Sequence, residues 1–203
     1  MLARGNRVSV TVRPRKSHRP VSTILNSRRQ LTLFATEPWR SRLNELRRLL
    51  DPVQASLISA HVTLCREDEI EYLETDSIVR RIKSWAHGPL ILAFGLPRRF
   101  SGHGVLLPCE RGSDQFHSLR QWLLQRQDVR AHEAHLTLAH PRNPPSAGNT
   151  EASLQSCPPA LQLQFPSVAL IEQQGSADWR VIAESTLGSG ASGSFGLRAV
   201  GTH

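Results

Sequence analysis

The chain has 203 residues, of which 39% are hydrophobic, and a formal net charge of +8 at pH 7. This length suits one domain of two lobes or two very small domains, and no apolar stretch approaches the length of a membrane span. The three cysteines are odd in number and lack paired spacing, which argues against a disulfide framework or zinc knuckle and favours a reducing, cytoplasmic compartment. They are Cys65, Cys109 and Cys157.

The positive charge is concentrated at the N-terminus. Residues 1–36 contain eight basic side chains and no acidic one, whereas the rest of the chain, from Glu37, has 17 of each. Such a segment is typical of an arm that binds nucleic-acid phosphates, of a targeting peptide, or of a disordered extension, which a start codon placed too far upstream would also produce. We predict a disordered arm over residues 1–29, a folded domain over 30–187 and a flexible Gly/Ser-rich tail over 188–203.

The first half of the folded region alternates strands with amphipathic helices. Apolar residues at 31, 33 and 34 predict a strand, and the segment from Pro38 to the Asp51-Pro52 pair has helical spacing. A second strand follows around His61. Residues 67–86 are acidic at first and then apolar at helical intervals, which predicts a second helix.

The next elements follow the same plan. Residues 90–94 and 104–107 are expected to be strands, joined by a basic loop with Arg98 and Arg99. Asp114 is the predicted cap of a helix whose buried stripe leads to a strand around His135.

The C-terminal part begins with a region rich in Pro, Ser and Asn over residues 141–160, which predicts a loop. Strand structure is expected from Leu161 to Leu170, with an interruption near Pro166. A turn over residues 173–178 then leads into a closing hairpin.

One short phrase occurs twice. His61-Val62-Thr63-Leu64 and His135-Leu136-Thr137-Leu138 share the pattern His-x-Thr-Leu and lie 74 positions apart. In a strand, residues i and i+2 share a face, so each copy places an imidazole beside a hydroxyl. Because each copy also ends a strand–helix–strand pattern of similar length, the sequence indicates an internal duplication. Two imidazoles can share acid and base roles, and two hydroxyls can hold a phosphoryl oxygen.

On these two motifs and the duplicated units, residues 30–187 resemble the 2H phosphoesterase superfamily, in particular its branch of 2′–5′ RNA ligase-like proteins and RNA 2′,3′-cyclic phosphodiesterases. The resemblance implies a bilobal α+β fold of duplicated strand–helix–strand units, with two antiparallel sheets facing each other across a central cleft and helices outside. It implies that His61 and His135 are the catalytic pair, that Thr63 and Thr137 bind phosphate oxygens, and that no metal or cofactor is required.

The expected function is metal-independent hydrolysis of 2′,3′-cyclic phosphates, at RNA ends or on nucleotides, to 2′-phosphates by a monomer. His135 is assigned as the base and His61 as the acid. Members of this branch often place a basic residue soon after the second Thr-Leu, a position taken here by His140, so Arg142 is added to the phosphate-binding set. The alternatives are a 2′–5′ RNA ligase, a phosphodiesterase acting on another cyclic or 2′–5′-linked nucleotide, and a non-catalytic RNA-binding module.

Other candidates have two interpretations. His132, His135 and His140 could suggest zinc, but their spacing differs from the helical His-Glu-x-x-His arrangement, and a strand would point 132 and 135 to opposite faces. His132 and His140 are therefore assigned to a loop or strand end.

The remaining candidates are a cysteine, two arginines and two aromatic residues. Cys65 could line the cleft or fill the core, and the Arg98–Arg99 pair could bind RNA or be a solvated turn. Phe34 and Phe100 could stack on a base, with core packing favoured for Phe34.

Overall fold

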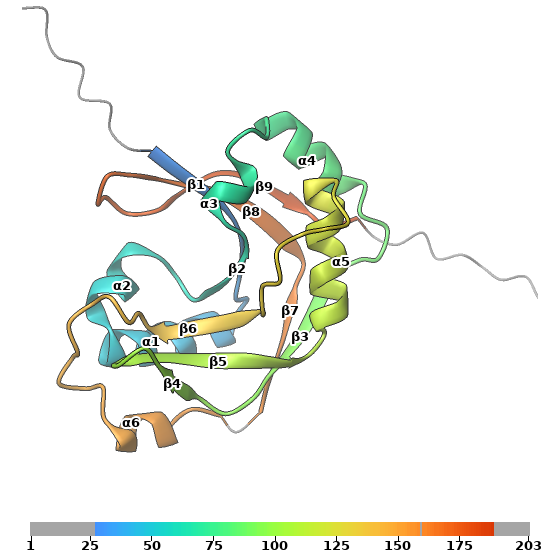
Figure 1. Ribbon diagram of the computed structural model, residues 1–203. Coiled ribbons are helices and arrows are strands. Elements are labelled where there is room, and N and C mark those ends of the chain that lie inside the picture. The colour runs from blue at the N-terminus through green and yellow to red at the C-terminus, as the bar shows by residue number, and fades with distance from the viewer. Residues whose placement is uncertain (1–26, 159, 189–203) are drawn as a thin grey trace, which may run out of the picture.

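The computed structural model describes residues 27–158 and 160–188 (Figure 1). Most of the predicted arm and of the predicted tail therefore lies outside the described residues. The elements in chain order are β1 (Ser27–Phe34), α1 (Trp39–Leu50), α2 (Pro52–Leu57), β2 (His61–Cys65), α3 (Glu67–Ile70), α4 (Thr75–Lys83), β3 (Leu90–Phe94), β4 (Arg98–Phe100), β5 (Gly104–Arg111), α5 (Ser113–Leu124), β6 (His135–Ala139), α6 (Glu151–Gln155), β7 (Leu161–Phe165), β8 (Ser167–Gln174) and β9 (Arg180–Thr186).

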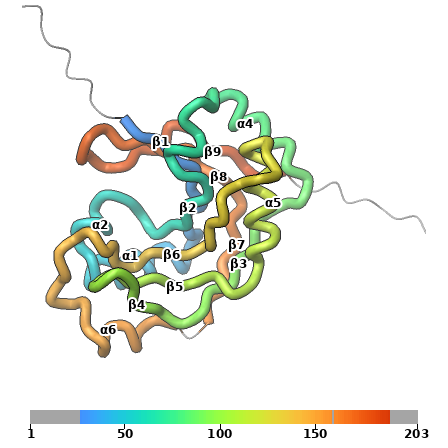
Figure 2. Tube along the Cα trace, viewed as in Figure 1, coloured from blue at the N-terminus to red at the C-terminus, as the bar shows by residue number. Residues whose placement is uncertain are grey.

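The strands form one curled antiparallel sheet. Their order is β7-β3-β5-β6-β2-β1-β8-β9, with β4 paired to β5 at one side (Figure 1). The predicted α+β class and antiparallel arrangement are confirmed, and the two predicted sheets are the halves of this single sheet, joined where β2 pairs with β6. The tube in Figure 2 follows the same curl and shows α4 and α5 beside each other.

The predicted duplication is visible in the strand register. In the first unit β1 pairs with β2 so that Leu33 lies opposite Val62, and in the second β5 pairs with β6 so that Leu107 lies opposite Leu136. Both positions of the second pair are 74 residues after those of the first, and α1 and α5, each of 12 residues, keep the same offset. Because Val62 also pairs with Leu136, the two units meet around a pseudo-two-fold axis at this point.

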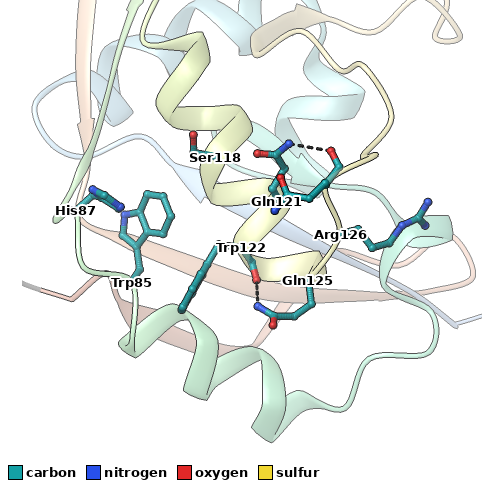
Figure 3. A pocket seen from close by; sticks show the side chains of 8 residues that line it. Trp85, His87, Ser118, Gln121, Trp122, Gln125 and Arg126 are labelled. Carbon is teal, nitrogen blue, oxygen red and sulfur yellow. Dashed lines mark hydrogen bonds between the residues drawn. The ribbon is translucent and has the colours of Figure 1, made fainter.

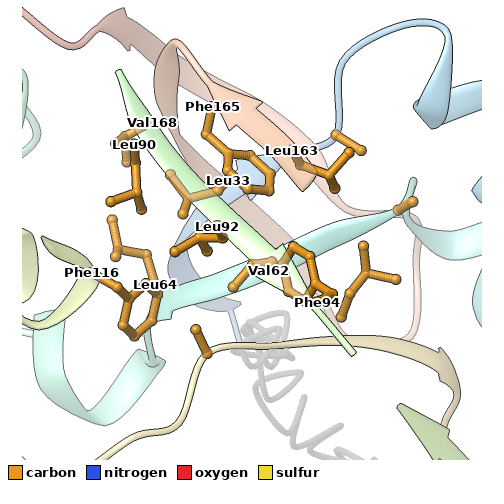
Figure 4. Packing of buried hydrophobic residues seen from close by; sticks show 14 of the residues in the cluster. Leu33, Val62, Leu64, Leu90, Leu92, Phe94, Phe116, Leu163, Phe165 and Val168 are labelled. Carbon is orange, nitrogen blue, oxygen red and sulfur yellow. The ribbon is translucent and has the colours of Figure 1, made fainter. Parts of the chain in front are cut away.

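The core lies on the face of the motif strands that carries Val62 and Leu64 in β2 and Leu136 and Leu138 in β6. Figure 4 shows Val62 and Leu64 of β2 packed among Leu33, Leu92 and Phe94. The helices are exchanged between the units, since α1 contacts β6 whereas α5 contacts β2 and β3. Burial of these apolar faces fixes which side of each strand is left for the cleft, because a slip of one residue would reverse every side chain.

Local predictions were wrong in several places. Arg98 and Arg99 belong to the short strand β4, because residues 98–100 pair with β5. The cap of α5 is Gly112, whose φ of 96° places it in the left-handed region, and Asp114 lies in the first turn. At Gly112 a Cβ would collide with the carbonyl oxygen of Ile91, so close backbone packing requires glycine.

Three segments carry helices or breaks that the sequence patterns did not indicate. The expected helix over 67–86 is divided into α3 and α4. The expected loop over 141–160 contains α6, whose cap Thr150 accepts a hydrogen bond from the Ser153 backbone N–H. The helix α2 follows the Asp51-Pro52 break, with Asp51 as its cap.

Within the described residues, the sheet already includes Ser27, Arg28 and Arg29, which lie before the predicted boundary and pair with β8. Within the described residues, no helix is long and apolar enough to cross a membrane.

Candidate active site

The two motifs lie next to each other on the concave face of the sheet. His61 and Thr63 share one face of β2, whereas the neighbouring Val62 and Leu64 are fully buried on the other. The β6 motif has the same burial pattern. With Val62 opposite Leu136, antiparallel pairing places each motif histidine beside the threonine of the other motif.

This register also sets the spacing of the two imidazoles. His61 and His135 occupy diagonal positions on adjacent strands, for which a backbone separation of roughly 7–8 Å is typical. The two imidazoles and the two hydroxyls therefore lie on one small area of the same sheet face.

Both histidines are held by the same backbone contact. Nδ1 of His61 lies 2.7 Å from the carbonyl oxygen of Ser59, and Nδ1 of His135 lies 2.8 Å from that of Glu133. A carbonyl oxygen only accepts hydrogen bonds, so Nδ1 carries the proton in each neutral ring. Nε2 is therefore left free for proton exchange in both.

A cleft of ≈ 530 Å³ contains the motifs. Its lining includes all five residues predicted from the sequence, namely His61, Thr63, His135, Thr137 and Arg142. Four arginines line it against one glutamate, which favours an anionic ligand. The cationic and other polar residues that the sequence analysis did not assign to the site are Arg28, Gln30, Arg47, Gln54, Arg66, Glu67, His132, His140, Asn143, Gln173 and Ser176.

His61 lies in a strongly perturbing environment. Burial, and then the positive charges of Arg47 and His135, lower its pKa from 6.5 to about 4, against the opposing effect of the Ser59 carbonyl. His61 is therefore neutral at neutral pH.

Arg47 is the charged residue behind His61. Its side chain is 1% exposed, and its guanidinium donates to the carbonyl oxygens of Ile58 at 2.5 Å and Gln54 at 3.4 Å. Its Nε has no hydrogen-bond partner within the described residues. Burial lowers the pKa of Arg47 to about 10, with Asp51 opposing, so the side chain remains a cation at neutral pH.

His132 enters the site from the segment before β6. Its Nε2 lies 3.2 Å from the carbonyl oxygen of Thr63, and its ring centroid is 5.6 Å from that of His135. His132 lies in the loop before β6, as predicted, so the alternation of a strand does not apply to it and it faces the same cleft as His135. Burial, His135 and Arg120 lower the pKa of His132.

The segment after β6 is held by a buried carboxylate. Asp51 is 4% exposed and accepts hydrogen bonds from the His140 backbone N–H at 2.8 Å and from the Asn143 amide at 2.9 Å. Nδ1 of His140 accepts from the backbone N–H of Arg142 at 3.2 Å. These contacts place the exposed Arg142 at the rim of the cleft.

Other candidates do not line the cleft. Cys65 is fully buried in the core, where burial and then Glu69 raise the pKa of its thiol to about 12. Phe34 packs edge-on against the His61 ring, with centroids 6.3 Å apart. Arg99 pairs with Glu151 outside the cleft. Across the described ranges, no group of three or more His, Cys, Asp or Glu side chains could hold a metal ion.

A second hollow, of ≈ 420 Å³, lies over α5 and the end of α4. Figure 3 shows Trp85 beside His87 and the face of Trp122 turned toward the same space. It shares no lining residue with the motif cleft, and the indole N–H groups of both tryptophans donate to backbone carbonyls.

This fold and site define a two-lobed α+β protein with paired His-x-Thr strands, and sequence comparison gives its family. The profile of the 2'-5' RNA ligase superfamily matches residues 34–177. The chain belongs to this superfamily, a group of phosphoesterase and ligase enzymes, as the resemblance of its motifs predicted. A search of curated protein sequences finds no significant match.

Solved structures resemble the chain at low sequence identity. The Escherichia coli LigT complex with NADP+ has the same fold and is 12% identical, with a TM-score of 0.51 over 80% of this chain and 98% of that one. The TT0787 protein of Thermus thermophilus is 16% identical, with a TM-score of 0.48 over 80% and 98%.

Proposed function

We propose that this protein is a metal-independent phosphoesterase that hydrolyses 2′,3′-cyclic phosphates, at RNA ends or on nucleotides, to 2′-phosphates. The observation that carries the proposal is the symmetric pair of histidines, each held through Nδ1 by a backbone carbonyl and each beside the threonine of the other strand. This arrangement offers two proton-transfer atoms on opposite sides of one phosphate position.

In the proposed reaction, a base takes a proton from water, and the water oxygen forms a new bond to phosphorus. The bond from phosphorus to the 3′ oxygen of the ribose breaks, and the acid gives that oxygen a proton. The products are a 2′-phosphate and a 3′ hydroxyl. Each proton transfer contributes a factor of about 10²–10⁴ in rate.

The electrostatics favour His61 as the base in the free protein. Its lowered pKa keeps Nε2 unprotonated and ready to accept a proton at neutral pH. His135 then serves as the acid. This assignment exchanges the roles made from the sequence, because neither the burial of His61 nor its proximity to Arg47 was visible there.

Thr63 and Thr137 donate hydrogen bonds to the non-bridging phosphate oxygens, and Arg142 adds positive charge from the rim. Preorganised donors of this kind stabilise the charge that develops on phosphorus oxygens in the transition state. The LigT structure determined with NADP+ supports a nucleotide as the ligand of the cleft.

The protein is proposed to act as a monomer in the cytoplasm. One chain supplies both histidines and both threonines. The cysteines at 65, 109 and 157 are free in the described structure, as a reducing compartment would keep them.

A 2′–5′ RNA ligase is the second candidate, because the matching family carries that activity in its name. Ligation would run related chemistry in reverse, with the two histidines exchanging roles.

The test is turnover of 2′,3′-cyclic mononucleotides and of a cyclic-phosphate-ended oligonucleotide in excess chelator. The variants are His61→Ala and His135→Ala, with His117→Ala, on the exposed face of α5, as the control. We expect opening to a 2′-phosphate in the wild type and in the control, with a loss of about 10²–10⁴ in each motif variant.

Three results would count against the proposal. Activity that both motif variants retain would remove the site assignment. Formation of 2′–5′ linkages without hydrolysis would favour the ligase. A folded protein that turns over none of these substrates, yet binds RNA equally well without either histidine, would be a binding module.

A further inference from the structure

Arg28 lies in the motif cleft, although the sequence placed it in the N-terminal arm. It belongs to β1 and lies directly opposite Gln173 of β8. Thr32, on the same face of β1, is the cross-strand partner of Thr63. Arg28 precedes Thr32 by four residues in β1, which separates the two residues by roughly 13 Å along the strand. The cleft therefore extends from the two motifs to this arginine.

A buried glutamine fixes the Arg28 side chain. The Gln173 residue is 2% exposed, and its amide N–H donates to the carbonyl oxygen of Ala177 at 2.6 Å. Its amide oxygen is thereby directed to Arg28 and accepts from both Nε, at 2.8 Å, and Nη2. A buried amide whose donor and acceptor are both used in this way limits the positions that the guanidinium can occupy.

Trp179 supports one face of the guanidinium. The Arg28 Cζ atom lies 5.1 Å from the centroid of the indole ring. Trp179 is itself held, since its backbone N–H donates to the carbonyl oxygen of Leu57 at 3.0 Å and it packs against the buried cluster of Ile58, Ala169 and Ile171. Both side chains are therefore held by contacts with the fold, with the guanidinium over the indole at the wall of the cleft.

The remaining surface of Arg28 is accessible. Its side chain is 46% exposed, and its ion pair with the half-exposed Glu67, at 3.8 Å, is of a kind that contributes little to stability. An arginine held by a buried amide and an indole, with its outer face open to an anionic cleft ligand, suits recognition better than stabilisation of the fold.

We propose that Arg28 and Trp179 form a subsite on which a nucleobase of the substrate stacks. The inference rests on the proposed function, because it takes the ligand of the cleft to be a nucleotide. Bases stack on arginine planes and on aromatic rings, and such contacts tolerate any base because every base has a π-face. The stacked base belongs either to the nucleotide whose phosphate lies between the motifs or to the next nucleotide of an RNA strand.

The chain offers a matched control for Arg28. Arg29, its neighbour, donates to the carbonyl oxygens of Glu71 and Leu73 and does not line the cleft. Arg28→Gln and Arg29→Gln remove the same charge from adjacent positions. Trp179→Leu has its control in Trp122→Leu, which removes a 40% exposed indole from the second hollow.

The experiment measures binding by calorimetry with three probes, which are inorganic phosphate, adenosine 3′-monophosphate and an adenylate dinucleotide with a terminal 3′-phosphate. We expect Arg28→Gln and Trp179→Leu to weaken nucleotide binding about tenfold, which corresponds to about 1.4 kcal/mol. Phosphate binding should change by less than a factor of two or so. A loss with the mononucleotide assigns the subsite to the terminal base, and a loss confined to the dinucleotide assigns it to the next base.

Two results would overturn the inference. Equal losses for phosphate and for the nucleotides would show an effect of charge alone, and equal behaviour of the Arg28 and Arg29 variants would show that no base stacks there. Turnover of cyclic phosphates, measured in parallel, separates this failure from that of the proposed function. Wild-type turnover with no Arg28 effect would remove the subsite only, whereas Arg28-dependent nucleotide binding without turnover would remove the catalytic proposal only.

Discussion

The first and second strand–helix–strand units share their strand register and the position of their long helix, but they have different surroundings. In both units, the carbonyl oxygen of the residue before the motif histidine accepts a backbone hydrogen bond of 3.0 Å. The donor is the Ala35 N–H for Ala60 in the first unit and the Cys109 N–H for Ala134 in the second. The register irregularity of the strand pairs also recurs with the 74-residue offset. Two copies of one local design therefore place the histidines in the same way.

The side chains around the two histidines differ. Behind His61 lies the buried cation Arg47, whereas His135 has the His132 ring beside it, at 5.6 Å. In the second unit the residue equivalent to Arg47, 74 positions later, is Gln121, which lines the second hollow and not the motif cleft. The comparison shows that duplication fixes where the imidazoles lie, while neighbours that are not repeated, Arg47 above all, lower the pKa of His61.

The largest expected effect is a decrease of the free energy of unfolding as the pH falls. The folded state favours neutral His61, because its pKa falls from 6.5 to about 4, so the unfolded state binds more protons as the pH drops below 6.5. The contribution of His61 to the free energy of unfolding is therefore fully present above pH 6.5, and it decreases by roughly 3 kcal/mol toward pH 4. Urea unfolding from pH 7 to 4 should show a flatter decline in His61→Gln than in the wild type.

His117→Gln, which changes an exposed histidine of α5, is the control for this measurement and should follow the wild type. The lowered pKa values of His132 and His140 act in the same direction, so a residual slope is expected in the His61 variant. If the pH dependence of stability is the same in His61→Gln as in the wild type, His61 is not a histidine with a lowered pKa in the folded protein.

The second expected effect tests what the two units share. Thr63→Val and Thr137→Val each remove one hydroxyl from equivalent positions, so each should lower kcat/KM on a cyclic phosphate by about 10–100-fold, as for a lost hydrogen bond to a charged group. Thr186→Val, at an exposed position of β9, should leave the rate unchanged. A loss in only one motif variant would mean that the phosphate is not held symmetrically.

The smallest expected effect tests what the two units do not share. Arg47→Met removes the nearby cation, so the pKa of His61 should rise from about 4 while burial keeps it below 6.5. The measurement is the NMR titration of the His61 ring in folded protein, with the acidic limb of kcat/KM moving in the same direction. Arg48→Met, which removes an exposed charge from the same helix, is the control. An unchanged titration would show that Arg47 does not lower the His61 pKa and would leave burial and His135 as the causes.

Several features were predictable because they are written in local patterns. Alternation of period two placed His61 and Thr63 on one strand face, and the repeated phrase with its repeated spacing indicated the duplicated units. The boundaries of short elements such as β4 and α6 were not predictable, because β4 forms by pairing with β5 and α6 depends on the cap at Thr150.

The sequence by itself therefore determined the motif strands, the duplication and the family, since each depends on residues close together in the chain or on a repeated pattern. Only the tertiary structure decided what surrounds the motifs. Arg28 meets Gln173 across 145 positions, and His132 reaches Thr63 across 69. Contacts over such separations arise from the curl of the sheet, which brings β8 and the segment before β6 to the same cleft, and no local pattern in the chain records them.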